Sequence, residues 1–219
     1  MTTTDPAAPN ALAVAEREAL ADLMIELGPD APTICGDWTT RDLAAHLVIR
    51  SDRPDAAAGI VIPALAGWTR KVQERAARRD WDELVATVRR GAPGWSLQSR
   101  PSLDGQSNTI EYFVHHEYVR RAREGWAPRE LDDAARASLW TRIAQAGKFF
   151  VRKSPVGVVV APTDGPAAGT ELTIKGGERS VTLRGPVGEI VLAIYGRVTQ
   201  GLAIEGEPQD VDAFLAFGR

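Results

Sequence analysis

Apolar residues recur at helical spacing through the first two thirds of the chain. The first such segment, NALAVAEREALADLMIELG, ends at Gly28 and Pro29, a pair that commonly terminates a helix. The next begins after Thr39, which resembles a capping box together with Asp42, and it ends before Pro54, because proline disfavours helix in the residue before it. The pattern therefore predicts a helix over about 40–52.

The helical pattern continues to about residue 150. Two more helices are expected, over residues 59–79 (with Pro63 near its first turn) and 80–90. The segment 91–108, rich in Gly, Pro, Ser and Asp, indicates a loop. Asn108 or Thr109 then caps a helix that runs to about Glu124, and LDDAARASLWTRIAQAGKFF predicts the last helix. We therefore expect a helical domain over residues 1–150.

The pattern changes beyond residue 150. Short β-branched segments bounded by Gly and Pro predict strands, namely VGVVVAP, TELTIKG, RSVTLRG and GLAIEG. Two amphipathic segments predict helices, namely PVGEIVLAIYGRV and QDVDAFLAFG. Residues 151–219 should thus form a small α+β domain, and the whole chain belongs to the α+β class.

Composition narrows the classes of partner. The chain is 44% hydrophobic and 25% charged, with a net charge of −3 and a pI near 5.7, so a surface for nucleic acid is not expected. Its single cysteine excludes an intramolecular disulfide and fits a reducing cytoplasm. The leader MTTTDPAAPN lacks the features of a signal peptide, and no apolar run is long enough to span a membrane. We expect a cytoplasmic protein, and no pattern indicates its oligomeric state.

Candidate chemistry is concentrated in EYFVHHEYVRR, residues 111–121. Glu111 and His115 are four residues apart, so on a helix they lie on one face, whereas His116 is rotated by about 100°. The chain's third histidine, His46, belongs to the helix predicted over 40–52. Ligands on two facing helices are how helical bundles build metal sites, so these three residues are a candidate metal site.

A structural interpretation stands beside this one. His46 lies among Leu43, Ala44 and Leu47, as a core histidine hydrogen-bonded to a carboxylate would, and Glu111 could be that carboxylate. Spacing alone leaves both interpretations open.

The pairing of DWTTRDLAAHL (37–47) with EYFVHHEYVRRA (111–122) resembles the DinB-like metal-binding family, specifically relatives of mycothiol-dependent maleylpyruvate isomerase. The likeness extends through APTICGDWTTRDLAAHLVIRSDRPDAAAGIV and is nearest to an uncharacterised metal-binding branch of that superfamily. It covers the helical domain well and residues 151–219 more loosely. The resemblance implies a DinB-like up-down helical bundle followed by a small α+β domain of the isomerase C-terminal type.

The resemblance also implies a ligand set and a chemistry. The family's ligands to a divalent ion, commonly zinc, fall on His46, Glu111 and His115. The implied function is that of a mycothiol-dependent isomerase or thiol transferase, whose partners are a small thiol and a small electrophile. The alternative is a non-catalytic metal- or ligand-binding module. Tyr118, a candidate substrate contact, departs from the family, which often has an acidic residue there, and this departure bears on the catalytic apparatus more than on the metal.

Several side chains near these residues have two interpretations. Arg50 and Arg53 follow His46 by four and seven residues and could receive a carboxylate or a sugar-derived group, or could form ordinary ion pairs. We expect His116 to pack or hydrogen-bond away from the ion. Glu117 and the arginines after it indicate a solvated face or a partner contact.

Overall fold

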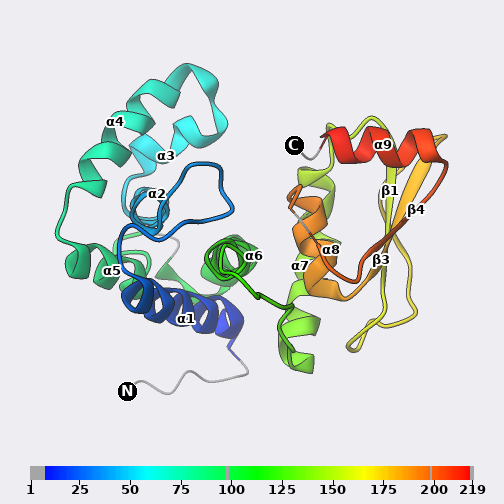
Figure 1. Cartoon of the computed structure of the whole chain (residues 1–219), viewed down its shortest axis with the longest axis horizontal. Coiled ribbons are helices and arrows are strands. Elements are labelled where there is room, and N and C mark those ends of the chain that lie inside the picture. The colour runs from blue at the N-terminus through cyan, green and yellow to red at the C-terminus, as the bar shows by residue number, and fades with distance from the viewer. Residues whose placement is uncertain (1–7, 97–98, 198, 218–219) are drawn as a thin grey trace. The chain divides into compact units, whose positions relative to one another are not determined.

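The structure, a computed structural model, describes residues 8–96, 99–197 and 199–217. The described chain contains nine α-helices and a four-stranded mixed sheet, which confirms the predicted α+β class (Figure 1). Its contacts divide it into two compact units, Met1–Ala127 and Pro128–Arg219. Most of the leader considered above lies outside the described residues, as do Val198 and Gly218, the last residues of two predicted elements.

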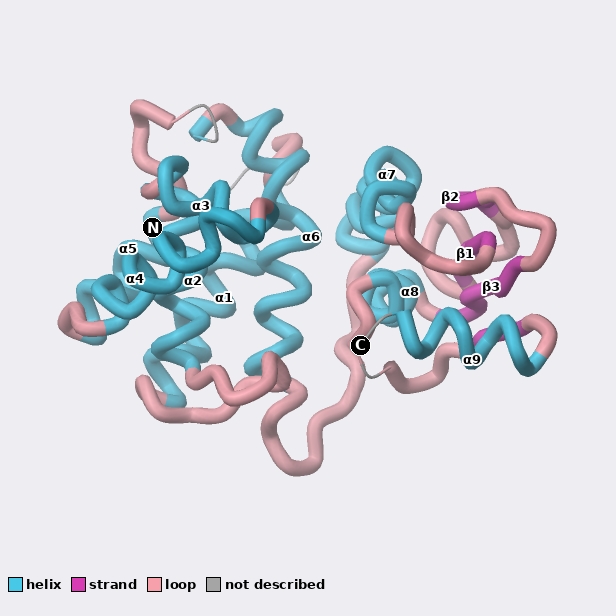
Figure 2. Tube along the Cα trace, turned by 90° about the horizontal axis from the view of Figure 1, so that it is seen from above, coloured by secondary structure: helices cyan, strands magenta, loops and turns pink. Residues whose placement is uncertain are grey.

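Unit 1 is helical. Its elements are α1 (Ala11–Leu27), α2 (Thr40–Asp52), α3 (Pro54–Val61), a 3₁₀ turn η1 (Pro63–Leu65), α4 (Ala66–Ala77), α5 (Trp81–Arg90) and α6 (Pro101–Arg120). The capping box at the start of α2 is confirmed, because Thr39 accepts from the backbone of Asp42 and the Asp42 side chain accepts from the backbone of Thr39. In Figure 2 the strands are confined to the other unit.

Two predicted helices of unit 1 have wrong boundaries. The segment predicted as one helix over 59–79 is α3, η1 and α4, with Pro63 starting the 3₁₀ turn between them. Helix α6 begins at Pro101, so Asn108 and Thr109 lie inside it and are buried, and it ends at Arg120, before Glu124. Some of the polar residues that suggested a loop are hydrogen-bonded within the fold. Asn108 donates to Asp104 at 2.7 Å, and Asn10, the residue before α1, donates to the same carboxylate.

The core of unit 1 lies between α1 and α6, with α2 packed against α4 and α5. Its members are apolar and almost fully inaccessible to solvent, and they include Leu20, Met24, Leu43, Ile49, Leu84 and Phe113. The apolar face of α2 is therefore buried in this core. Because the capping box fixes the start of the helix, it also determines where His46 lies along it.

Unit 2 combines a sheet with three helices. Its elements are α7 (Asp133–Phe150), β1 (Gly157–Pro162), β2 (Leu172–Lys175), β3 (Ser180–Gly185), α8 (Val187–Ile194), β4 (Ala203–Glu205) and α9 (Pro208–Phe217). The strand order is β2-β1-β3-β4, with β1 and β3 parallel and the outer pairs antiparallel. Every residue of α8 is buried, so this helix forms the centre of the unit's core.

Helix α7 belongs to unit 2 by its contacts, because it packs against α8 and β2. The sequence predicts a domain limit near residue 150, at the end of α7, whereas the contacts divide the chain between Ala127 and Pro128, before α7 begins. Hydropathy and helix length along the described residues leave no helix that could cross a membrane.

Candidate functional site

Helices α2 and α6 bring together the three residues of the predicted metal site. The rings of His46 and His115 have centroids 5.4 Å apart, and the Nδ1 atom of His115 lies 3.7 Å from Oε2 of Glu111. Residues separated by more than sixty positions along the chain are thus neighbours in the fold, and His116 is not among them.

The tautomer of His115 follows from one contact. Its Nδ1 atom lies 2.7 Å from the backbone oxygen of Glu111, and a carbonyl oxygen can only accept, so Nδ1 carries the proton. In the neutral ring the lone pair is then on Nε2. Metal-binding histidines commonly donate their other nitrogen to a backbone carbonyl in this way. Tyr118 packs edge-on against the same ring at 5.2 Å and is buried.

His46 is held as a neutral imidazole. Its pKa is lowered from 6.5 to about 3, chiefly by burial; nearby His115 and Arg50 also lower it, while Glu111 opposes them. Its ring packs against the indole of Trp38, with centroids 5.2 Å apart. A neutral imidazole is the form that binds a metal ion.

The low pKa predicts how His46 titrates in metal-free protein. The unfolded chain binds a proton near pH 6.5 and the folded chain only near pH 3, so the free energy of unfolding should fall as the pH drops through that window. The share due to His46 is about 1.4 kcal/mol per pH unit. NMR titration of the three histidine rings, assigned with a His46→Gln variant, checks this; a His46 ring that titrates near pH 6.5 would refute the environment described for it.

The two arginines after His46 are committed to other partners. Arg50 donates to Asn108 Oδ1 and to the Ser107 carbonyl, and its Nε lies 3.5 Å from Glu111 Oε2. Arg53 forms a two-pronged pair with the exposed Asp55 carboxylate, with a shortest distance of 2.7 Å. Neither guanidinium is therefore presented as a carboxylate receptor beside His46.

The donor types suit zinc, but their present arrangement does not enclose an ion. Two imidazoles and one carboxylate are a common three-ligand set with an open fourth position. Among the residues that the structure describes, no group of three or more His, Cys, Asp or Glu side chains is placed to hold a metal. The Glu111 carboxylate does not face both histidine rings as a shared ligand would. It faces Arg50 and the Nδ1 side of His115. An ion would require this side chain to turn away from Arg50.

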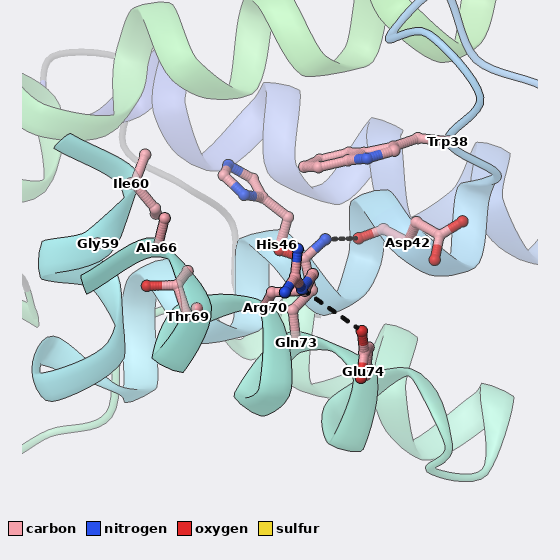
Figure 3. A pocket seen from close by; sticks show the side chains of 11 residues that line it. Trp38, Asp42, His46, Gly59, Ile60, Ala66, Thr69, Arg70, Gln73 and Glu74 are labelled. Carbon is pink, nitrogen blue, oxygen red and sulfur yellow. Dashed lines mark hydrogen bonds and ion pairs between the residues drawn. The ribbon is translucent and has the colours of Figure 1, made fainter. Parts of the chain in front are cut away.

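A cavity of about 570 Å³ opens beside His46, between α2 and the α3–α4 segment (Figure 3). Its lining residues are Trp38, Asp42, His46, Gly59, Ile60, Ala66, Gly67, Thr69, Arg70, Gln73 and Glu74. A volume of this size accommodates a small organic molecule next to the imidazole.

Two glycines of this lining predict opposite effects of the same substitution. A Cβ at Gly59 would lie 2.5 Å from the Leu65 carbonyl oxygen, whereas a Cβ at Gly67 would have no neighbour within 4 Å. Gly59→Ala should therefore lower the free energy of unfolding by about 1–3 kcal/mol, through forced separation of α3 from η1. Gly67→Ala should leave it unchanged or raise it by up to about 1 kcal/mol. Urea unfolding checks both, and equal effects would contradict the close approach at Gly59.

The sequence interpretation missed two buried ionic clusters. His116 bonds Glu16 of α1 at 2.7 Å, with both side chains buried. Glu117 is 1% exposed and bonds Arg121 at 2.7 Å and Arg120 at 2.9 Å, so the interpretation of Glu117 as part of a solvated face is wrong. The position of Glu16 within the apolar stripe of α1, three residues after Ala13 and four before Leu20, could have indicated a buried carboxylate.

Comparison with known proteins gives a likeness in fold. No family model and no curated protein matches the chain. Among solved structures, a mycothiol-dependent maleylpyruvate isomerase matches with a TM-score of 0.58 and 16% identity, over 91% of this chain and 92% of that one. A histidine-to-alanine mutant of that isomerase matches equally well. The chain thus has a fold similar to that of mycothiol-dependent maleylpyruvate isomerase.

Proposed function

We propose that this chain is a cytoplasmic, thiol-dependent isomerase or thiol transferase that acts on a small electrophile and uses a divalent ion, with zinc the expected ion and mycothiol the expected thiol. The observation that carries the proposal is the meeting of His46, Glu111 and His115 beside a cavity large enough for a small molecule. The fold similarity to an enzyme named for its dependence on mycothiol supports the thiol.

The three residues have distinct parts in the proposed site. His46 offers a nitrogen that stays neutral at physiological pH, and His115 offers Nε2 because its Nδ1 is bonded to the Glu111 carbonyl. Glu111 offers a carboxylate oxygen after it leaves Arg50, whose other contacts to α6 can persist. A bound divalent ion supplies one thing here, the stabilisation of a thiol as its thiolate near neutral pH.

The surrounding residues position reactants in the proposed site. Trp38 covers one side of the His46 ring, and the cavity admits the electrophile on the α3–α4 side. Tyr118, buried against His115, restricts the ring's rotation and has no access to the cavity lining. The substrate contacts considered for Arg50, Arg53 and Tyr118 are accordingly not part of this proposal.

A second candidate is a non-catalytic ligand-binding module. It is favoured by the contact of Glu111 with Arg50, because the carboxylate is already satisfied by a cation of the protein itself. In that case the histidines and Glu111 stabilise the packing of α2 on α6, and ligand binding in the cavity has no chemical step.

A thermal-shift experiment separates the two candidates. The enzyme predicts that mycothiol raises the melting temperature of the zinc-loaded protein and has no effect on protein stripped with a chelator, because the thiolate needs the ion. The module predicts the same response in both forms. Loss of the mycothiol shift in a His115→Ala variant reloaded with zinc would locate the effect at this site.

A further inference from the structure

The cavity beside His46 holds more carboxylates than cations. The acidic lining residues are Glu74 and Asp42, whose carboxylate also caps α2 through Thr39, and Arg70 is the single Lys or Arg among the lining residues, all of which the structure describes. Arg70 Nε lies 4.0 Å from Glu74 Oε1, so its charge is already opposed by one of them. An anionic group entering the cavity would meet a net negative field.

The two arginines that follow His46 add no positive charge to the lining of this cavity. Arg50 is bonded to α6, and Arg53 is paired with Asp55 and lines a separate cavity of about 370 Å³. Neither of them belongs to the lining beside His46. Arg70, opposed by Glu74, is therefore the one lining residue with the planar two-pronged donor that binds carboxylates well.

The walls of the cavity are largely apolar. Trp38, Ile60 and Ala66 contribute rings or methyl groups, and Gly59 and Gly67 contribute bare backbone. Ile60 is 44% exposed, and Ile62, Leu65 and Trp68 on the same α3–α4 segment are exposed to a similar degree. Trp38 and Ile60 in the lining favour a ligand that removes their apolar surface from water.

We infer that the cavity accepts an uncharged, apolar group, so that the electrophile handled at this site is a neutral molecule and not a dicarboxylate. That the ligand reacts as an electrophile rests on the proposed function, whereas its neutral, apolar character rests on the cavity alone. Maleylpyruvate, which gives the similar enzyme its name, carries two carboxylates. The cavity lining does not favour a dicarboxylate of this kind.

Binding of a matched pair of probes tests the inference on metal-free protein. Dimethyl succinate and succinate share a carbon skeleton, differ in charge, and do not react with thiols. The readout is the indole N–H signal of Trp38 in NMR titrations of the full chain, assigned with a Trp38→Phe variant. At low ionic strength the diester should bind at least about tenfold more tightly than the dianion.

A charge variant and its control locate the effect. Glu74→Lys replaces a lining carboxylate with a cation and should reduce the preference for the diester at least about tenfold. Glu18→Lys makes the same charge change at an exposed position of α1 and should leave the preference unchanged. Succinate binding as tightly as the diester, or no response of Trp38 to the diester, overturns the inference. Because the metal is removed, this outcome is independent of whether the chain binds zinc or a thiol.

Discussion

Replacing His46 or His115 with alanine is expected to weaken zinc binding by more than about 100-fold, because each substitution removes one of the three proposed donors. Loss of a group that merely orients a ligand already costs about 10–100-fold in metal affinity, so loss of the ligand itself must exceed that. Glu111→Ala should have a comparable effect, and Glu111→Gln, which keeps the shape but loses the charge, should also fail to restore binding. Titration against a competing chelator measures each affinity.

His116→Gln is the matched control for these variants. It removes the neighbouring imidazole on the same helix, but His116 bonds Glu16 on α1 and lies away from the other two rings. Because that pair is buried, folding of the variant is first checked by circular dichroism. Zinc affinity within about threefold of the unaltered protein is expected. A fall as large as that of the His115 variant would show that His115 has no special part in the site.

The largest effect on stability is expected at Glu117. Its carboxylate is 1% exposed and bonds both Arg120 and Arg121, and Arg121 is also buried, with its guanidinium 4.4 Å from the centre of the Trp126 ring. Glu117→Ala leaves a buried guanidinium without this partner, which typically costs about 3–5 kcal/mol. Chemical unfolding measures the change.

Glu124→Ala is the control for Glu117. Glu124 is an exposed acidic residue in the segment after α6, and its loss should change the free energy of unfolding by no more than about 0.5 kcal/mol. A loss below about 1 kcal/mol for Glu117→Ala would mean that Arg121 finds water or another acceptor and that the ion pair contributes little to the fold.

Elements with strong local signals could be predicted from sequence. Helix α2 was expected over 40–52 and is observed from Thr40 to Asp52, because a capping box and Pro54 fix its two ends chemically. Helix α6 was predicted to start too late. Its first turns are polar and contain Gly105, and they are stabilised by a tertiary bond from Asn10 to Asp104 and by a bond from Asn108 to Asp104 within the helix.

The proximity of the three candidate residues was predictable from sequence, and the orientation of their side chains was not. Helical spacing indicates that Glu111 and His115 share a face, and the scarcity of histidines points to His46. The Glu111 carboxylate faces Arg50. Helical spacing places Arg50 near the same face of α2 as His46, but in the structure its guanidinium bonds α6. Side-chain orientation of this kind follows from packing between helices, which no local pattern encodes.

The contact between Arg50 and Glu111 bears directly on the proposed metal. A divalent ion would compete with the guanidinium for one carboxylate, and in the proposed site it would gain because it would also bind two imidazoles that the guanidinium cannot use. The open cavity then lies on the side of His46 from which a substrate can approach.

Metal analysis of the protein purified without a histidine tag tests the central claim most directly. The claim is that His46, Glu111 and His115 together bind one divalent ion. Elemental analysis after dialysis against a low concentration of zinc should find close to one ion per chain in the unaltered protein and less than about a tenth of that in the His46→Ala variant. The same zinc content in both proteins, or none in either, would contradict it.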